Sequence, residues 1–407
     1  MKLPAVVLAL AAVYLGLECA AALILTAEDA TGWLPPGRAL RLRLRELSVA
    51  WGDRAFFIPF DPLCQVRMMP GDTYYGLLID ENGYIGNGHQ DPALSAFPEK
   101  PPGIVRVLLL GGSSAAGLGV RENAQTIAAH LERLLNQRAG KARYQVLNYG
   151  TAGAGTNVEL ALYLLKLRYL DPDAVICIDG YNDVQNAVFE PKRWDMDAGL
   201  INWGDYSYFY FDYMNGFFHG RPLPSRLFTF SRLLARRHLA FLSPSTPASL
   251  HTGLPLHAIS RRVAKDDPTL AGVTRNNLDA MAATATRGGP VFLFYLQPHA
   301  ADGKKPLTAQ ERENLQRWFD FNLTNYRGLD RREFIVRLNA AYAALDKVYQ
   351  ELDAKYRQDP EVRFFVIRDL FANEKRTVYL DNLHTNALGN ALIAQRMAAD
   401  LADALGG

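Results

Sequence analysis

Two serines lie in a glycine-rich turn of a kind that can present a nucleophile. The stretch 106–119 reads RVLLLGGSSAAGLG, so that Ser113 and Ser114 follow a run of apolar residues and two glycines. Such a run is typical of a strand buried on both faces, and glycine permits a sharp turn at its end. We therefore expect a serine at the carboxyl end of a buried strand, where open α/β sheets bind ligands. The alternative is a plain turn with two solvated serines.

A carboxylate and an imidazole lie close together near the C-terminus. Asp381 and His384 belong to the stretch YLDNLHTN, which precedes a predicted helix with Thr385 or Asn386 as its cap. A carboxylate at this spacing can hold an imidazole in one tautomer while the other ring nitrogen faces a serine. The alternative is a capped loop with a surface histidine.

Two further turns offer groups that can stabilise negative charge. The stretch 148–156 contains Gly150, Gly153 and Gly155, and glycines allow backbone N–H groups to approach a ligand closely. The helix expected after them adds its positive N-terminal dipole. Asn182 follows another apolar run and can present its amide to a developing oxyanion. The alternatives are a flexible connector and an ordinary turn.

The elements that must position these residues alternate between strand and helix. Apolar runs predict strands at 105–110, 144–148, 174–178, 291–296 and 363–367. Helical periodicity predicts helices at 122–136, 157–169, around 276–285 and at 387–405. Repeated βαβ units imply a parallel sheet with helices on both faces. Gln297 and His299 follow the fourth strand, so we expect them to line the pocket.

The stretches 106–119 and 148–156 resemble sequence blocks of the SGNH hydrolase family, the GDSL-type esterases and lipases. Gly111-Gly112-Ser113 with Gly117 matches the first block, and the resemblance implies that Ser113, rather than Ser114, is the nucleophile. In the second block, the family's oxyanion-hole glycine lies five residues after an asparagine, which here is Gly153. Gly112 replaces the family's usual aspartate, as in its membrane-anchored branches, and this leaves the substrate open.

The other two stretches complete the resemblance. Gly180 to Asp183 matches the third block and gives Asn182 the role of a second oxyanion donor. The Asp-x-x-His of the last block matches Asp381 and His384. The resemblance thus implies a three-layer α/β/α flavodoxin-like fold with a parallel five-stranded sheet. It also implies a Ser113–His384–Asp381 triad and an oxyanion hole formed by Ser113, Gly153 and Asn182.

These roles predict a serine esterase that hydrolyses O-acyl esters, for example O-acetyl esters, on a carbohydrate or cell-envelope polymer. The substrate expectation rests on an exported location, on family analogy and on the many aromatic rings between 203 and 218. The mechanism requires no metal and no cofactor, and the sequence shows no metal-ligand cluster. Two alternatives remain: an O-acyltransferase with the same triad, and a non-catalytic binding or assembly protein with this fold.

Composition limits the other classes of function. The chain has 407 residues and a net charge of +2, so no global charge favours nucleic acid as a partner. Its three cysteines do not form a disulfide framework or a metal-binding spacing. The length suits one elaborated α/β domain with a leader, and the oligomeric state stays open.

The N-terminal residues predict a membrane segment. Residues 3–27 carry a single charge, Glu18, and would span about 37 Å as a helix, enough to cross a bilayer. We expect a retained signal anchor with an exported catalytic domain, and the alternative is a cleaved secretory signal. The predicted divisions are an anchor at 1–27, an extension and linker at 28–103, and a hydrolase domain at 104–407 with an insertion at about 185–266.

Overall fold

The computed structural model describes residues 98–138, 143–185, 270–285, 288–323 and 330–406. Short stretches between 60 and 88, two short strands between 194 and 201, and six helical residues between 13 and 20 are also described. The chain divides into two compact units. One takes Arg54–Asn202 and Pro255–Gly407 and contains every element discussed below, and the other takes Met1–Asp53 and Trp203–Leu254.

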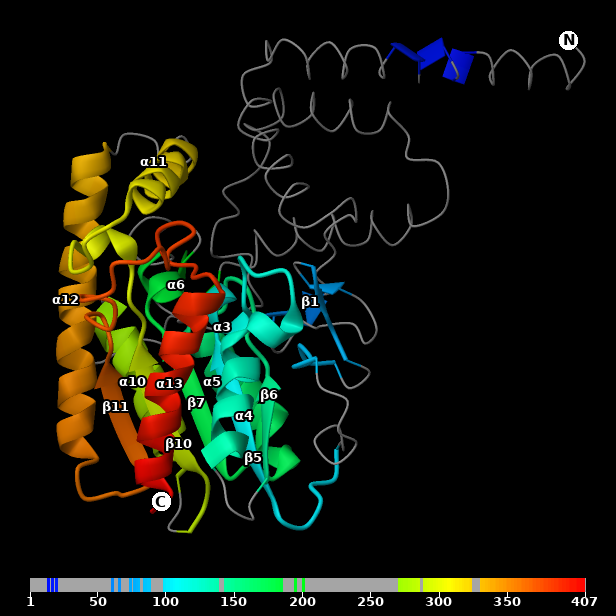
Figure 1. Ribbon diagram of the computed structural model, residues 1–407, viewed down its shortest axis with the longest axis vertical. Helices are drawn as coiled ribbons and strands as arrows, with labels where there is room; N and C mark the ends of the chain where they lie inside the picture. The colour runs from blue at the N-terminus through cyan, green and yellow to red at the C-terminus, as the bar shows by residue number, and fades with distance from the viewer. Residues whose placement is uncertain are drawn as a thin grey trace, which may run out of the picture. The chain divides into compact units, whose positions relative to one another are not determined.

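A sheet of five parallel strands forms the centre of the first unit (Figure 1). Its order is β11-β10-β7-β5-β6, which read from β6 is the doubly wound order 2-1-3-4-5. The predicted parallel five-stranded sheet is therefore confirmed, and each strand begins and ends within one residue of its predicted bounds. The strands are β5 (Ile104–Gly111), β6 (Arg143–Asn148), β7 (Ala174–Asp179), β10 (Val291–Leu296) and β11 (Val362–Val366).

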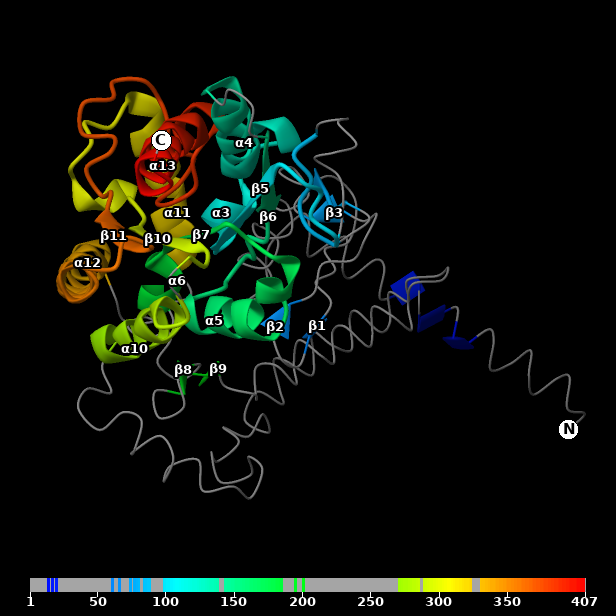
Figure 2. The same ribbon diagram turned by 90° about the horizontal axis from the view of Figure 1, so that it is seen from below.

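Helices cover both faces of this sheet, as Figure 2 shows in a view from below. On one face α4 (Ile127–Arg138) packs against α13 (Ala387–Ala404). On the other face α10 (Leu270–Ala282) lies between α5 (Thr156–Leu165) and α12 (Arg331–Lys355). With helices on both faces, every residue of β7 and β10 is buried, which explains their uninterrupted apolar sequences.

One predicted helix begins later than its sequence pattern suggests. The pattern predicted a helix from position 122, but α4 begins at Ile127 after a 3-10 turn. The hydroxyl of Thr126 accepts the N–H of Ala129 at 3.2 Å, which caps the first turn of α4. The cap therefore fixes the start of the helix.

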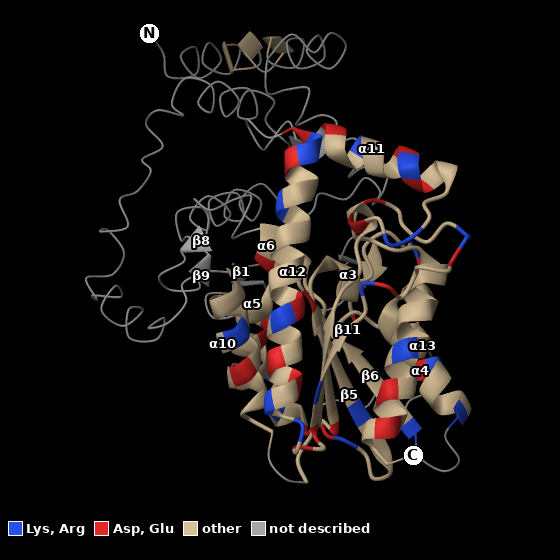
Figure 3. Cartoon of the chain, turned by 90° about the vertical axis from the view of Figure 1, so that its left-hand side faces the viewer, with Lys and Arg blue, Asp and Glu red and all other residues tan. Residues whose placement is uncertain are grey.

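Two helices lie between β10 and β11, and the sequence patterns above gave bounds for neither. The first is α11 (Ala309–Leu323) and the second is the 25-residue α12. Figure 3 shows the charged residues of α12 spread along its length. Its buried residues, from Phe334 through Leu338, Leu345 and Leu352, recur at helical spacing. The side chain of Asp330 accepts the N–H of Glu333 and caps its start.

The remaining described elements are short. At the carboxyl ends of the strands, α3 (Ser113–Ala116) and α6 (Tyr181–Val184) lie near the same end of the sheet (Figure 1). The others are β1 (Phe60–Asp61), β2 (Gln65–Val66), β3 (Thr73–Tyr74), β4 (Leu77–Leu78), η1 (Asn123–Gln125), η2 (Leu167–Leu170), β8 (Trp194–Asp195), β9 (Leu200–Ile201) and η5 (Ala300–Asp302).

The predicted anchor at 1–27 and most of the insertion at 185–266 lie outside the described residues. Within the part of the chain that the structure describes, no helix has the length and apolar content needed to cross a bilayer.

Candidate active site

The turn after β5 holds Ser113 at the end of the sheet. Gly111 has φ +146°, and a Cβ there would lie 2.6 Å from the carbonyl oxygen of Ile178 on the neighbouring strand. Glycine is therefore required where β5 and β7 approach each other. Ser113 begins α3, and Gly117, with φ +93°, caps the C-terminal end of this helix. As the first residue of a helix, Ser113 has a backbone N–H without an intrahelical partner.

Ser113, His384 and Asp381 form a continuous chain of hydrogen bonds. The Nε2 of His384 lies 2.7 Å from Ser113 Oγ, and its Nδ1 lies 2.5 Å from Asp381 Oδ2. A carboxylate only accepts, so Nδ1 carries the ring proton and Nε2 is left to accept from the serine hydroxyl. Ser114 points elsewhere, because its Oγ lies 3.5 Å from the carbonyl oxygen of Leu383.

Asp381 also holds its own loop. Its Oδ1 accepts the backbone N–H groups of Leu383 and His384, each at 2.8 Å. Burial alone would raise the pKa of Asp381, but the His384 ring and these two N–H groups lower the pKa below its ordinary value. The carboxylate is therefore charged at neutral pH and can orient the imidazole. Asn386 then caps α13 by accepting the N–H of Gly389, as predicted for this helix start.

Gly153 and Asn182 lie in the loops that follow the adjacent strands. Gly153 has φ +80°, a conformation that favours glycine, and nothing lies within 4 Å of where its Cβ would be. Among the described residues its N–H has no hydrogen-bond partner. The Nδ2 of Asn182 donates to the carbonyl oxygen of Ala154 at 2.7 Å, so its amide lies against the Gly153 loop. The structure thus brings both predicted donors together beside the serine turn.

Gly112 is the position at which the chain departs from the family pattern, and the structure gives a reason. Its φ of −76° is open to any residue. However, a Cβ on Gly112 would lie 2.1 Å from Asn182 Nδ2 and 3.2 Å from the carbonyl oxygen of Ala154. The Asn182 amide therefore occupies the space that a side chain at position 112 would need.

Asp183 links the loop that contains Gly153 to the loop that contains Asn182, a contact that the sequence did not predict. Its carboxylate is fully buried and accepts from the Thr156 hydroxyl at 2.8 Å and from the Thr156 N–H at 3.3 Å. Thr156 begins α5 three residues after Gly153, whereas Asp183 directly follows Asn182. One side chain therefore caps α5 and links the loop of Gly153 to that of Asn182.

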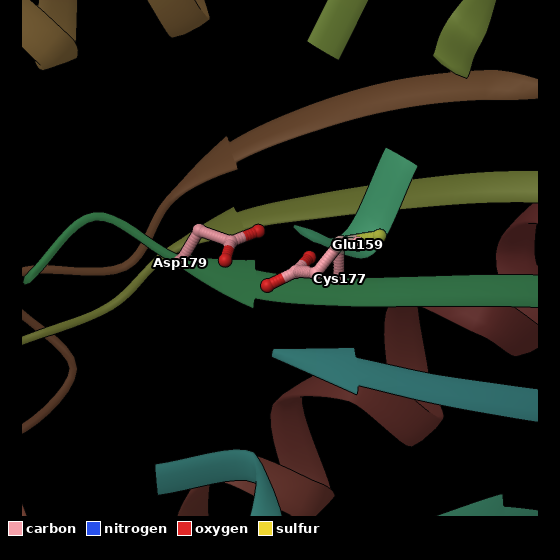
Figure 4. Close-up of side chains that lie close together, drawn as sticks. All are labelled: Glu159, Cys177 and Asp179. Atoms are coloured by element: carbon pink, nitrogen blue, oxygen red, sulfur yellow. The ribbon is translucent and has the colours of Figure 1, made fainter. Parts of the chain in front are cut away.

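Three buried groups behind these loops offer ligand atoms for a metal ion. The carboxylates of Glu159 and Asp179 and the thiol of Cys177 lie within 4.8 Å of one another (Figure 4). Burial is the main cause that raises the pKa of each group, to about 7 for Asp179 and well above the ordinary value for Glu159 and Cys177. Metal ligands must be deprotonated, so this environment favours bound protons over a cation.

His299 does not line a pocket, and that expectation is corrected. Its ring is fully buried and packs on Tyr342, with a centroid distance of 4.2 Å. Burial, together with the positive charges of Arg368 and Lys304, lowers the pKa of His299 to about 3. The neutral ring thus belongs to the core, where an aromatic body packs well. Gln297 is likewise buried.

Two residues that hold the loop of Asp381 and His384 in place were not predicted from the sequence. Glu311 and Asn382 are fully buried, and both bond to backbone groups. Glu311 lies in a mostly polar stretch, and nothing in that stretch indicates which distant N–H groups its carboxylate accepts. Asn382 was visible within the last block, but its spacing alone predicts no partner.

Comparison with solved structures finds hydrolases of low similarity to this chain. No family model and no curated protein sequence matches it. LAE5, an α/β hydrolase from the metagenome of Lake Arreo, is 13% identical with a TM-score of 0.36, over 72% of this chain and 94% of that one. Axe2, an acetylxylan esterase from Geobacillus stearothermophilus, is 10% identical with a TM-score of 0.36, over 72% and 93%.

A third structure is a two-domain esterase active on acetylated mannans. It is 13% identical with a TM-score of 0.33, and the match covers 78% of this chain and 52% of that one. All three neighbours are described as esterases or hydrolases. Likeness at this level is too distant to transfer an activity, so the geometry of the site must carry the functional conclusion.

The buried group of Glu159, Cys177 and Asp179 predicts how the free energy of unfolding changes with pH. Because the pKa of Asp179 is about 7 in the folded chain and near 4 when unfolded, its contribution to stability is lost as pH rises through this window. Asp179→Asn removes this titration. Relative to wild type, the free energy of unfolding of the variant should therefore rise between about pH 4 and pH 7, by at most about 1.4 kcal/mol per pH unit.

Urea unfolding at several pH values measures this difference. Asp403→Asn, at an exposed carboxylate on α13, is the matched control and should follow wild type. A variant that loses stability relative to wild type as pH rises would contradict the account. It would mean instead that the cluster is stabilised in its charged form, as a bound cation would require.

Proposed function

We propose that this chain is a serine esterase of the SGNH type. The single observation that carries the proposal is the hydrogen-bonded chain from Ser113 Oγ through His384 to Asp381. This arrangement gives the three groups the order of nucleophile, base and orienting acid. The two donor loops beside the serine support the same reaction, because acyl transfer needs N–H donors at the developing oxyanion.

Acylation begins at Ser113. His384 Nε2 accepts the hydroxyl proton as Oγ attacks the ester carbonyl carbon, and the imidazolium formed is stabilised by the Asp381 carboxylate. The carbonyl oxygen becomes an oxyanion that accepts from the N–H groups of Ser113 and Gly153 and from the Asn182 amide. The Asn182 amide nitrogen carries two hydrogens, so it can donate one to the oxyanion while the other keeps its bond to the Ala154 carbonyl oxygen. His384 then gives its proton to the departing alcohol.

Deacylation repeats these steps with water. His384 Nε2 takes a proton from a water molecule, which attacks the acyl-enzyme through a second tetrahedral oxyanion. Collapse of that oxyanion releases the carboxylic acid and returns the proton to Ser113. In this reaction the chain's own residues supply every proton transfer and every oxyanion contact.

We propose that the acyl group is carried by a carbohydrate. Two of the neighbours act on such esters by their descriptions, acetyl-xylooligosaccharides in one case and acetylated mannans in the other. The density of aromatic residues between 203 and 218 also suits sugar faces, since rings offer them flat apolar surfaces. An exported location, with residues 1–27 as an anchor, would expose the site to envelope polysaccharides.

Ester hydrolysis by Ser113 variants tests the proposal. The full chain should hydrolyse a short-chain chromogenic ester, and Ser113→Ala should lower kcat by at least about 1000-fold because no nucleophile remains. Ser114→Ala is the control and should retain activity, since Ser114 contacts Leu383 rather than the imidazole. Loss in Ser114→Ala alone, or no activity in a folded wild type, would overturn the proposal. Transfer to an added sugar in preference to water would show an acyltransferase.

Gly112→Ala tests the assignment of Asn182. The added methyl group would displace the amide, so kcat should fall about as far as in Asn182→Ala, by roughly 100-fold for one lost oxyanion donor. The double variant should be no worse than either single variant, because both remove the same contact. Additive losses would mean that Gly112 and Asn182 act separately. Circular dichroism provides the check on folding.

A further inference from the structure

The loop from Val378 to Asn386 carries both Asp381 and His384 and belongs to no helix or strand of the sheet. Its own bonds close it into a hairpin-like shape. The N–H of Leu380 donates to the His384 carbonyl oxygen at 2.9 Å, and the N–H of Asn386 donates to the Val378 carbonyl oxygen at 2.8 Å. These bonds fix the shape of the loop but not its position relative to Ser113.

Glu311 holds the base of this loop. The residue lies in the first turn of α11 and is fully buried. Its Oε1 accepts the N–H of Val378 at 2.9 Å and that of Tyr379 at 3.0 Å. The two bonds cross 67 and 68 residues of sequence and end two residues before Asp381. Glu311 is therefore a direct link from α11 to the segment that carries the acid and the base.

The second oxygen of Glu311 is bonded as fully as the first. Oε2 accepts from Lys305 Nζ and from the Thr308 N–H, each at 2.8 Å. The Lys305 and Glu311 side chains are 2% and 0% exposed, so the ion pair is buried. Burial alone would raise the pKa of Glu311, but Lys305 and the N–H groups bring the pKa below its ordinary value. Charged hydrogen bonds of this kind are stronger than neutral ones.

Asn382 holds the tip of the same loop. Its carbonyl oxygen accepts the Ala300 N–H at 2.7 Å, and its Oδ1 accepts the Ala301 N–H at 3.0 Å. Both donors lie in η5, in the connection between β10 and α11. The segment from 300 to 311 thus contacts the loop on either side of Asp381, once through Glu311 and once through Asn382.

We propose that Glu311 is a positioning residue for catalysis, which holds the loop so that His384 Nε2 lies at hydrogen-bond distance from Ser113 Oγ. This inference rests on the proposed esterase function. Glu311 contacts neither the imidazole nor the serine and acts only through the backbone of Val378 and Tyr379. A displacement of about 1 Å in a catalytic group can cost about 100-fold in rate, so a fixed base for the loop matters to kcat.

Two variants test the role of Glu311. Glu311→Gln keeps the shape of the side chain but offers only one oxygen and places amide hydrogens against Lys305 and Thr308. Because this leaves a buried ammonium without a counter-charge, the double variant Lys305→Met/Glu311→Gln removes both charges together. We expect kcat for ester hydrolysis to fall about 10- to 100-fold in each, with KM within about twofold. Glu313→Gln, at an exposed pair with Arg317 on the same helix, is the control and should match wild type.

Hydrogen exchange separates positioning from general destabilisation. In both Glu311 variants the amides of Leu380, Leu383 and His384 should exchange faster, while those of β10 keep their wild-type rates. An unchanged kcat in a folded variant would overturn the inference, as would a fall in kcat with equally faster exchange throughout the sheet. A wild type without esterase activity would refute the proposed function instead, and exchange at these amides would still report whether Glu311 holds the loop.

Discussion

The hydrogen bond between Ser113 and His384 joins groups that lie 271 residues apart in sequence, and the architecture around the site serves to keep it short. The sheet supplies one side, because its parallel strands end at the same edge and deliver Ser113, Gly153 and Asn182 together. The other side is a loop without regular structure. It needs external bonds to be held in place, since a loop of this length could otherwise adopt many positions.

Buried charge provides those external bonds on both sides of the site. Asp183 accepts the N–H and hydroxyl of Thr156 and so links the loop of Gly153 to that of Asn182, while Glu311 accepts two N–H groups at the base of the loop from Val378 to Asn386. Each carboxylate accepts several charge-assisted hydrogen bonds at once, which no neutral side chain of this size can do. The environments differ, however. Lys305 neutralises Glu311, whereas Asp183 lies near other carboxyl groups and its pKa is raised, chiefly by burial, to about 6.

Local signals in the sequence predicted the strands and the four blocks. Apolar runs marked all five strands to within a residue, because helices cover both faces of the sheet and bury most of the strand residues. Glycine turns marked the ends of β5 and β6 for the same local reason. The helix α12 carried a clear periodicity from Phe334 to Leu352 that was not used. Glu311 had no such signal, because its partners are backbone groups of a distant loop. The amide that fills the space beside Gly112 likewise depends on a contact across the fold.

The most direct test of the account is the reaction of the full chain with a fluorophosphonate, followed by mass spectrometry of its peptides. An activated serine forms a covalent adduct with this reagent, whereas an ordinary serine does not. The account predicts one adduct, on Ser113, which is lost in Ser113→Ala, retained in Ser114→Ala and formed much more slowly in His384→Ala. A folded chain that forms no adduct, or forms it on Ser114, would contradict the claim that the Ser113–His384–Asp381 chain is a catalytic triad.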